Sequence, residues 1–153
     1  MAKQTKAYTL IELLVVVTIG TIIFTVGFAG YREFSRRQAL SGILRQTKAD
    51  LRLAQQSALT GQKPIAATCT ILNGYTFNQL NSTTYQLIAN CSNADSVVKT
   101  VTMPDNTTIS AGSVQFKVLG QGTNLTSPLT FSIANTKSGT AGTVVVGIGG
   151  DVQ

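Results

Sequence analysis

Residues 6–17 read KAYTLIELLVVV, a stretch in which one acid, Glu12, stands at the start of a long apolar run. Leu13 to Ala29 is almost unbroken in apolar residues, and with Tyr8 to Ile11 the run reaches the roughly 20 residues that a helix needs to cross a bilayer. We therefore predict a membrane-inserted helix. A carboxylate at mid-membrane costs roughly 2.5 to 3.5 kcal/mol, so an acid inside such a helix is expected to have a cationic partner.

A chain cut before Tyr8 would supply that partner for Glu12. The new α-amino group has an intrinsic pKa of about 8, is mostly protonated at neutral pH and lies one helical turn from the acid. In a filament, the amine of a neighbouring subunit could serve instead. The alternative is a conventional signal peptide cut near Gly27 and Ala29, since two lysines precede the run, but it leaves Glu12 without an explanation.

From Tyr31 to Leu59 the apolar pattern becomes amphipathic. No proline occurs before Pro64, so nothing interrupts the backbone, and the pattern predicts one continuous helix of about 50 residues. Gly61 and Pro64 are typical of a helix end. The residues that recur at steps of three and four, and so share one helical face, are Leu40, Leu44, Thr47, Leu51, Ala54 and Ala58.

Beyond Pro64 the chain is rich in Thr, Ser, Asn and Gly, with short β-branched or aromatic runs between turn residues. The spacing predicts an antiparallel sheet or small sandwich, and therefore an α+β protein in which the apolar stripe of the helix covers the sheet. Residues 147–150, Gly-Ile-Gly-Gly, are interpreted as a terminal turn. The predicted strands are Ile65–Leu72, Tyr75–Asn78, Thr84–Ala89, Val97–Met103, Val114–Val118, Leu129–Ile133 and Thr143–Ile148.

Charge is scarce and unevenly placed. Charged residues make up 12% of the chain, where a soluble protein has about 25%. The net charge of +6 divides into +2 on residues 1–7, +3 on residues 8–59 and +1 on the remainder, so the basic excess does not indicate a nucleic-acid-binding C-terminal domain. The chain has no histidine, the usual general base and commonest zinc ligand. We predict no catalytic site, no cofactor and no metal.

Two cysteines, Cys69 and Cys91, lie well after the apolar run. An even count in a translocated domain predicts one disulfide between them, because thiols persist mainly in reducing compartments. Closing a loop of this length would stabilise the fold by roughly 3 kcal/mol. Two unpaired, buried cysteines are the alternative.

Residues 9–15, TLIELLV, resemble without a gap the prepilin leader and methylation motif of type IV pilins and type II secretion pseudopilins. In that family a short basic leader ends in glycine and is followed by Phe-Thr-Leu-Ile-Glu and an apolar run. The resemblance implies that residues 1–7 are a leader, that prepilin peptidase cuts between Ala7 and Tyr8, that Tyr8 is N-methylated and that Glu12 serves assembly. Ala7 replaces the usual glycine and Tyr8 the usual phenylalanine, so the alanine methyl could slow processing.

The resemblance also implies the type IV pilin-like fold, a long N-terminal helix packed on a C-terminal antiparallel β domain. Residues 8–30 would form the transmembrane and assembly half of the helix, 31–60 the amphipathic half and 61–153 an extracytoplasmic β-rich domain. The implied partners are the prepilin peptidase and methyltransferase, other pilins or pseudopilins, and an inner-membrane assembly platform. The chain would cross the inner membrane once, with its C-terminal domain periplasmic or extracellular, and then enter a pilus or pseudopilus.

A looser resemblance extends over the second half of the chain to the GspH/FimT group of minor pseudopilins and minor pilins. It rests on residues 51–58, 114–122, 130–133 and 143–146. Some members bind DNA through a Gly-Arg-x-Arg motif near the C-terminus. Here residues 149–153 read Gly-Gly-Asp-Val-Gln, so the basic residues that would release counterions are missing and we predict no DNA binding.

These patterns predict a structural subunit, a minor pilin or minor pseudopilin, and not an enzyme. A major pilin is one alternative, and an anchored extracytoplasmic binding module that never polymerises is another. Arg32, Arg36 and Arg37 follow the apolar run directly. They would bind anionic lipid or acidic faces of neighbouring subunits, or they form an ordinary solvated helix face.

Overall fold

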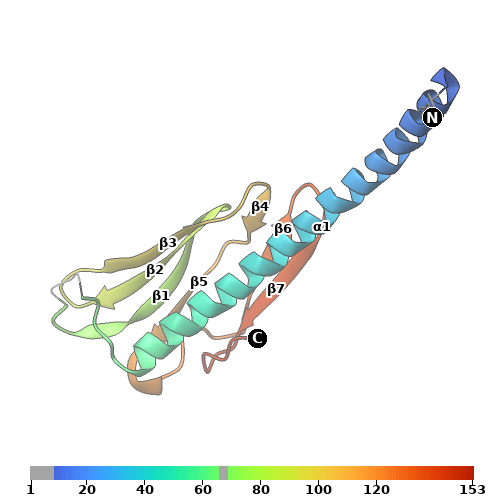
Figure 1. The fold of residues 1–153 in the computed structure, drawn as a ribbon. Helices are drawn as coiled ribbons and strands as arrows, with labels where there is room; N and C mark the ends of the chain where they lie inside the picture. The colour runs from blue at the N-terminus through green and yellow to red at the C-terminus, as the bar shows by residue number, and fades with distance from the viewer. Residues whose placement is uncertain (1–8, 66–68) are drawn as a thin grey trace, which may run out of the picture. The chain divides into compact units, whose positions relative to one another are not determined.

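The computed structural model describes residues 9–65 and 69–153. The chain divides into two units, Met1–Arg36 and Arg37–Gln153, and we describe each by itself. The helix α1 (Leu10–Leu59) contributes to both units (Figure 1). Its 50 residues confirm the predicted continuous helix.

The C-terminal end of α1 is a Schellman motif. Gly61 has a φ of 62°, a left-handed conformation that favours glycine. The Gly61 N–H donates to the carbonyl oxygen of Ala58 at 3.2 Å, and the Gln62 N–H donates to that of Ser57 at 3.0 Å. These two bonds satisfy carbonyl groups that would otherwise be left open at the helix end, so the predicted stop at Gly61 is confirmed.

The unit Arg37–Gln153 contains two antiparallel sheets (Figure 1). The four-stranded sheet has the order β3-β2-β1-β5, and the three-stranded sheet has the order β4-β6-β7. A 3-10 turn, η1 (Val118–Gly120), follows β5. The strands are β1 (Leu72–Asn81), β2 (Thr84–Cys91), β3 (Ser96–Thr102), β4 (Thr107–Ile109), β5 (Ser113–Lys117), β6 (Leu129–Asn135) and β7 (Ala141–Val146). The predicted α+β class, a long helix with an antiparallel β domain, is confirmed.

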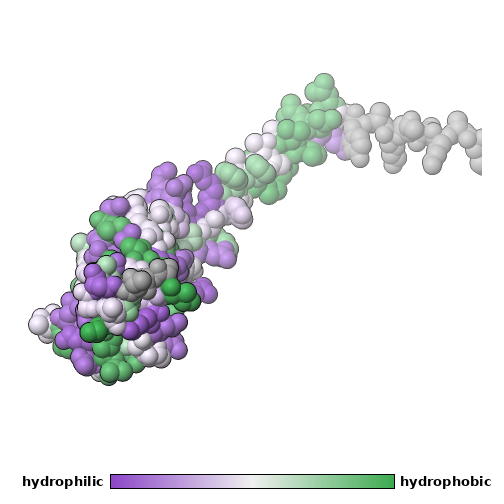
Figure 2. Space-filling view, turned by 90° about the vertical axis from the view of Figure 1, so that its left-hand side faces the viewer, coloured by the Kyte–Doolittle hydropathy of each residue, from purple (hydrophilic) through white to green (hydrophobic). Residues whose placement is uncertain are grey.

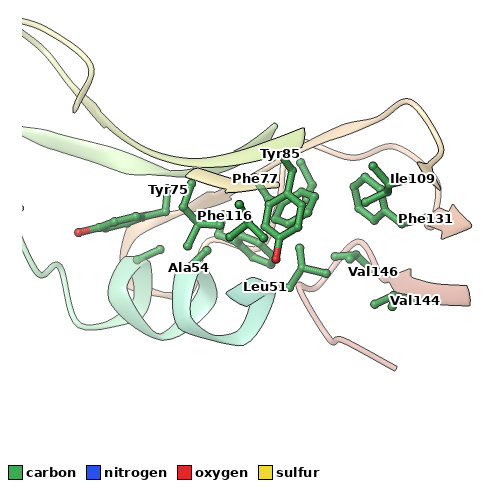
Figure 3. Packing of buried hydrophobic residues seen from close by; sticks show 14 of the residues in the cluster. Leu51, Ala54, Tyr75, Phe77, Tyr85, Ile109, Phe116, Phe131, Val144 and Val146 are labelled. Carbon is green, nitrogen blue, oxygen red and sulfur yellow. The ribbon is translucent and has the colours of Figure 1, made fainter. Parts of the chain in front are cut away.

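The core lies between the second half of α1 and both sheets. Figure 3 shows Leu51 and Ala54 of α1 close to the aromatic residues of the sheets. The ring of Phe77 lies 4.6 Å from that of Tyr85 and 5.0 Å from that of Phe131, centroid to centroid, so it links the two sheets. The buried helix residues are Leu40, Ile43, Thr47, Leu51, Ala54, Asp50, Ser57 and Ala58.

The predicted apolar stripe of α1 is therefore confirmed except at one position, Leu44. Ile43, which the prediction omitted, is buried, whereas Leu44 is half-buried. Leu44 lies over Gly142 of β7, where an added Cβ would collide with a methyl group of the leucine. A glycine at this point of β7 lets the helix approach the sheet closely.

A polar cluster also joins α1 to the four-stranded sheet. The buried carboxylate of Asp50 accepts a hydrogen bond from the Tyr85 hydroxyl at 2.7 Å and lies 2.7 Å from Nζ of Lys99. Burial, and then the hydrogen bond to Asp50 and its charge, raise the pKa of Tyr85. This cluster gives a buried acid both a cation and a donor, as burial of a charge requires.

Two strand predictions need correction. Residues 65 and 69–71 do not form the predicted strand Ile65–Leu72, and residues 66–68 lie outside the described residues. This segment is held as a connection by other contacts: Cys69 is bonded to Cys91, the Lys63 amine donates to the Thr70 carbonyl oxygen, and the Ser92 N–H donates to the Ile71 carbonyl oxygen. The strand β4 was missed, because its three residues are too few to show a period. The remaining strands agree with prediction to within a few residues at their ends.

A disulfide and the pairing of the C-terminus add further contacts within the unit Arg37–Gln153. Cys69 and Cys91 form the predicted disulfide, which ties the connection after α1 to the end of β2, so the alternative of unpaired cysteines is wrong. The predicted terminal turn is confirmed, since residues 147–151 reverse the chain. Gln153 then pairs with Val145 of β7 through two backbone hydrogen bonds.

Candidate assembly segment

The start of α1 is a cap built by Thr9. The Glu12 N–H donates to Oγ1 of Thr9 at 3.3 Å, and the Leu13 N–H donates to the Thr9 carbonyl oxygen at 3.2 Å. Threonine followed three residues later by glutamate is the capping-box pattern, and an acid in the first turn interacts favourably with the helix dipole. Glu12 therefore stabilises the start of α1 whether or not a second chain is present.

The surface of α1 within Met1–Arg36 is apolar. The large hydrophobic side chains described between Leu10 and Phe28 are 47–84% exposed. None of the most apolar 18-residue window is buried, and by length and composition this helix can cross a membrane. Hydrophobic residues, in green, dominate this helical segment in Figure 2. An exposed apolar surface of this extent marks a contact with lipid or with other chains.

Three threonines inside the apolar segment satisfy their own hydroxyl groups. Oγ1 of Thr18 donates to the carbonyl oxygen of Val15 at 2.8 Å, and Oγ1 of Thr21 donates to that of Val17 at 2.8 Å. Oγ1 of Thr25 donates to the carbonyl oxygen of Thr21 at 3.0 Å. These hydroxyls need no water, which is the condition for polar groups in a hydrocarbon environment.

Aromatic and cationic residues follow the apolar segment. The guanidinium carbon of Arg32 lies 5.8 Å from the centre of the Phe28 ring, in cation–π range, and Arg36 lies 3.9 Å from Glu33. Such residues are typical of a membrane boundary. Arg32 and Arg36 thus have partners within the chain, which accounts for part of the basic cluster without lipid or a second subunit.

The predicted processing residues lie outside the described residues. They are Ala7 and Tyr8, at the proposed cut, together with the rest of the leader, residues 1–7. Glu12 lies in the first turn of α1 and its side chain is exposed. Glu12 belongs to one unit of the chain, and Cys69 and Cys91 belong to the other.

Sequence reasoning missed the cap at Thr9, although the spacing of Thr9 and Glu12 is a signal that could have found it. The glycines in the N-terminal part of α1 have open space around them. A Cβ added at Gly20, Gly27 or Gly30 would meet no atom within 4 Å, so no contact inside the described chain requires glycine there.

Comparison with known families identifies this segment. Residues 2–28 match the family model of the prokaryotic N-terminal methylation motif. The motif supports a type IV pilin-like protein. The match covers the predicted leader, Glu12 and most of the apolar part of α1. No curated protein and no solved structure gave a match to the pilin-like chain.

The motif accounts for the exposed apolar surface of α1. The motif implies processing by prepilin peptidase and assembly into pilin filaments. The family is structural and not enzymatic. The apolar helix fits a membrane-anchored pilin, and the long helix with an antiparallel β domain is consistent with the pilin fold.

Proposed function

We propose that the pilin-like chain is a minor pilin or minor pseudopilin that is cut between Ala7 and Tyr8, methylated on Tyr8 and polymerised through residues 8–30. Before assembly it would cross the inner membrane once, with residues 61–153 on the periplasmic side. The observation that carries the proposal is the apolar surface of α1, none of whose most hydrophobic window is covered by the described chain. Lipid before assembly and neighbouring helices after it would cover this surface.

Glu12 would set the position of one subunit against the next. Its carboxylate lies in the first helical turn, where the α-amino group of a processed neighbour can approach it. In an apolar surrounding, an acid and an amine that meet are far more stable together than apart. The favourable interaction of an acid in the first turn with the helix dipole is a competing account of why this position is acidic.

The segments that resemble the GspH/FimT group support the minor-subunit version. Each contributes residues to the core of the β domain, among them Leu51, Val114, Phe131 and Val144. The likeness therefore concerns the packing of α1 on the sheets. Nucleic-acid binding is not part of the proposal, because the terminal turn carries Asp151 and no basic residue.

Glu12→Gln separates the two roles of this residue. Glutamine is also accepted in a capping box, so the helix start is retained while the charge is removed. We expect the variant to be processed but to fall at least about tenfold in sheared filaments, since an unpaired amine would then be buried. Glu33→Gln, which changes an acid on the same helix beyond the apolar segment, is the matched control and should enter filaments like the unaltered chain.

Mass spectrometry of the mature N-terminus tests the processing step in the same samples. An N-methylated Tyr8 is expected. An intact Met1, or a cut near Ala29, would contradict the proposal and favour an anchored module that does not polymerise. Normal incorporation of Glu12→Gln would show that assembly does not need the charge of Glu12.

A further inference from the structure

A row of basic residues lies on the outward side of α1 in the unit Arg37–Gln153. Its members, Arg45, Lys48 and Arg52, follow one another at steps of three and four residues, so they share one side of the helix. Arg45 and Arg52 are exposed, and Lys48 is half-buried. We call these three residues the basic row.

The arginines of the basic row lie opposite the core. Arg45 follows the buried Ile43 by two residues. Arg52 precedes the buried Ala54 by two residues. Two residues correspond to about 200° of rotation around a helix. Leu51 and Ala54 point from α1 toward the sheets in Figure 3, so the side of α1 that carries the arginines faces away from the sheets.

The described chain leaves the charge of the basic row uncompensated. Nη2 of Arg45 donates to Oγ of Ser41, and Nη2 of Arg52 donates to the carbonyl oxygen of Val152, each at 3.4 Å. These are long hydrogen bonds to neutral oxygen atoms. In the part of the chain that the structure describes, no carboxylate forms an ion pair with a residue of the row.

The neighbouring helix residues add no negative charge at the surface. In residues 37–59, Arg37 and the basic row stand against one acid, Asp50. The carboxylate of Asp50 is buried and already pairs with Lys99. A helix whose surface is simply solvated commonly carries both signs of charge at steps of four residues. A surface with one sign of charge instead favours a partner of the opposite sign.

An uncharged line runs along α1 beside the basic row. Its members, Gly42, Ala49 and Gln56, are exposed and lie seven residues apart, so they stay aligned to within about 20° per repeat. Gly42 precedes Arg45, and Ala49 precedes Arg52, by three residues each, which makes them neighbours on the helix surface. Small side chains let the backbone of a second helix come close. The row and the line together therefore fit an elongated partner, a helix that carries acids.

A second copy of this chain does not offer such a helix. The other acids of the unit are Asp95, Asp105 and Asp151, which lie in three separate connections outside the helix and the strands. Two basic rows brought together would repel each other. The charges thus favour a different chain as the neighbour, which agrees with a minor subunit placed among other pilins.

We propose that the basic row binds the acidic side of the long helix of a different pilin-like chain. Carboxylates at steps of three or four residues on that helix would face the row. Arginine suits this contact because its guanidinium can bind a carboxylate through two parallel hydrogen bonds. Glycine and alanine offer no side-chain donor to a phosphate, so the uncharged line favours a helix over a nucleic acid. The inference rests on the proposed function as a filament subunit and names the chemistry of one neighbour.

Photo-cross-linking in filament-forming cells tests which molecule covers this side of α1. A benzophenone amino acid replaces Ala49 in the full-length chain, and sheared filaments are irradiated. Mass spectrometry should find the adduct on a helix that follows a prepilin-type motif in a different chain and has carboxylates at steps of three or four residues. The same probe in place of Thr18, in the apolar segment, is the matched control and should link to neighbouring helices.

Charge reversal provides a second readout. Arg45→Glu/Arg52→Glu should remove the adduct at position 49 and lower incorporation into filaments at least about tenfold, because acids would then face acids. Arg45→Lys/Arg52→Lys keeps the charge and should keep most of the incorporation. Lys117→Glu/Lys137→Glu, at two exposed lysines of the β domain, changes the net charge equally and should enter filaments normally.

A charge swap and a folding check complete the design. Replacing the acids of the linked helix by lysine should restore incorporation of the double glutamate variant. Retention of the Cys69–Cys91 disulfide and normal amounts of membrane-bound chain show that each variant has folded.

Several results would overturn the contact. An adduct with a second copy refutes the different chain, and an adduct with lipid or with nuclease-sensitive material refutes a protein partner. Adducts at position 18 but none at position 49, or normal incorporation of the double glutamate variant, refute the contact and leave the proposed function intact. An unaltered chain that never enters filaments refutes the proposed function, and this contact with it.

Discussion

Lys99→Met should destabilise the β domain because it leaves the buried carboxylate of Asp50 without its cation. The side chain of Asp50 is 6% exposed, and that of Lys99 is 39% exposed. Lys99 Nζ lies 2.7 Å from one carboxylate oxygen, and the Tyr85 hydroxyl lies 2.7 Å from the other. Methionine keeps much of the apolar stem of lysine, so the change isolates the loss of charge.

The geometry sets the size of the effect. Removing one partner of a fully buried ion pair costs about 3 to 5 kcal/mol, whereas an exposed pair contributes about 0.2 to 1 kcal/mol. Here one partner is buried, the other reaches solvent, and the hydrogen bond from Tyr85 remains. We therefore expect a loss of about 2 kcal/mol, intermediate between those limits. In a domain of this size that corresponds to a fall in melting temperature of roughly 8 °C.

Thermal unfolding of the full-length chain in detergent, followed by near-ultraviolet circular dichroism, measures this loss. Lys137→Met, at an exposed lysine of the same domain, is the control and should change stability by less than about 0.5 kcal/mol. In Lys99→Met/Asp50→Asn the charge that lacks a partner is gone, so the combined loss should be smaller than the sum of the two single losses. Equal melting temperatures for the two lysine variants, or additive losses, would refute the reasoning.

Three further changes test other parts of the β domain. Burial raises the pKa of Tyr85, so the folded chain holds the hydroxyl proton more tightly than the unfolded chain does. The stability that this difference gives to the folded state is fully present below about pH 10 and is lost as the pH rises further. Tyr85→Phe should therefore weaken the alkaline decline of stability seen in urea unfolding. Gly74→Ala should cost about 2 kcal/mol or more, since its φ is 157° and an added Cβ would overlap the Phe116 carbonyl oxygen; unchanged thermal stability would contradict this. Replacing Cys69 and Cys91 by serine should lower the free energy of unfolding by about 3 kcal/mol, and an unchanged denaturant midpoint would show that the disulfide is dispensable.

Features that depend on neighbours along the chain were predictable. The helix from Leu10 to Leu59 follows from an apolar run, then an amphipathic period, with no proline before Pro64. Its end at Gly61 follows from the freedom of glycine at positive φ. The acid in the first turn and the even number of cysteines were also visible, and they led to the pilin-like class and to the disulfide.

Features that depend on distant partners were not predictable. The segment before Leu72 has a strand-like composition, yet the disulfide to Cys91 and the hydrogen bonds of Thr70 and Ile71 hold it as a connection. Periodicity could not choose between Ile43 and Leu44, because the gap that accommodates Leu44 is created by Gly142 in β7. A local pattern describes which face is apolar, and only packing decides how deeply each residue is buried.

The sequence by itself determined a long helix with an apolar N-terminal half, an acid one turn inside it and a β-rich domain closed by one disulfide. The tertiary structure decided that the strands form two sheets and that Asp50 meets Lys99 across 49 residues. The physical reason is the distance along the chain over which each interaction acts. Helix period, capping and chain stiffness act over a few residues, whereas sheet order and side-chain contacts depend on how distant segments fill the same volume.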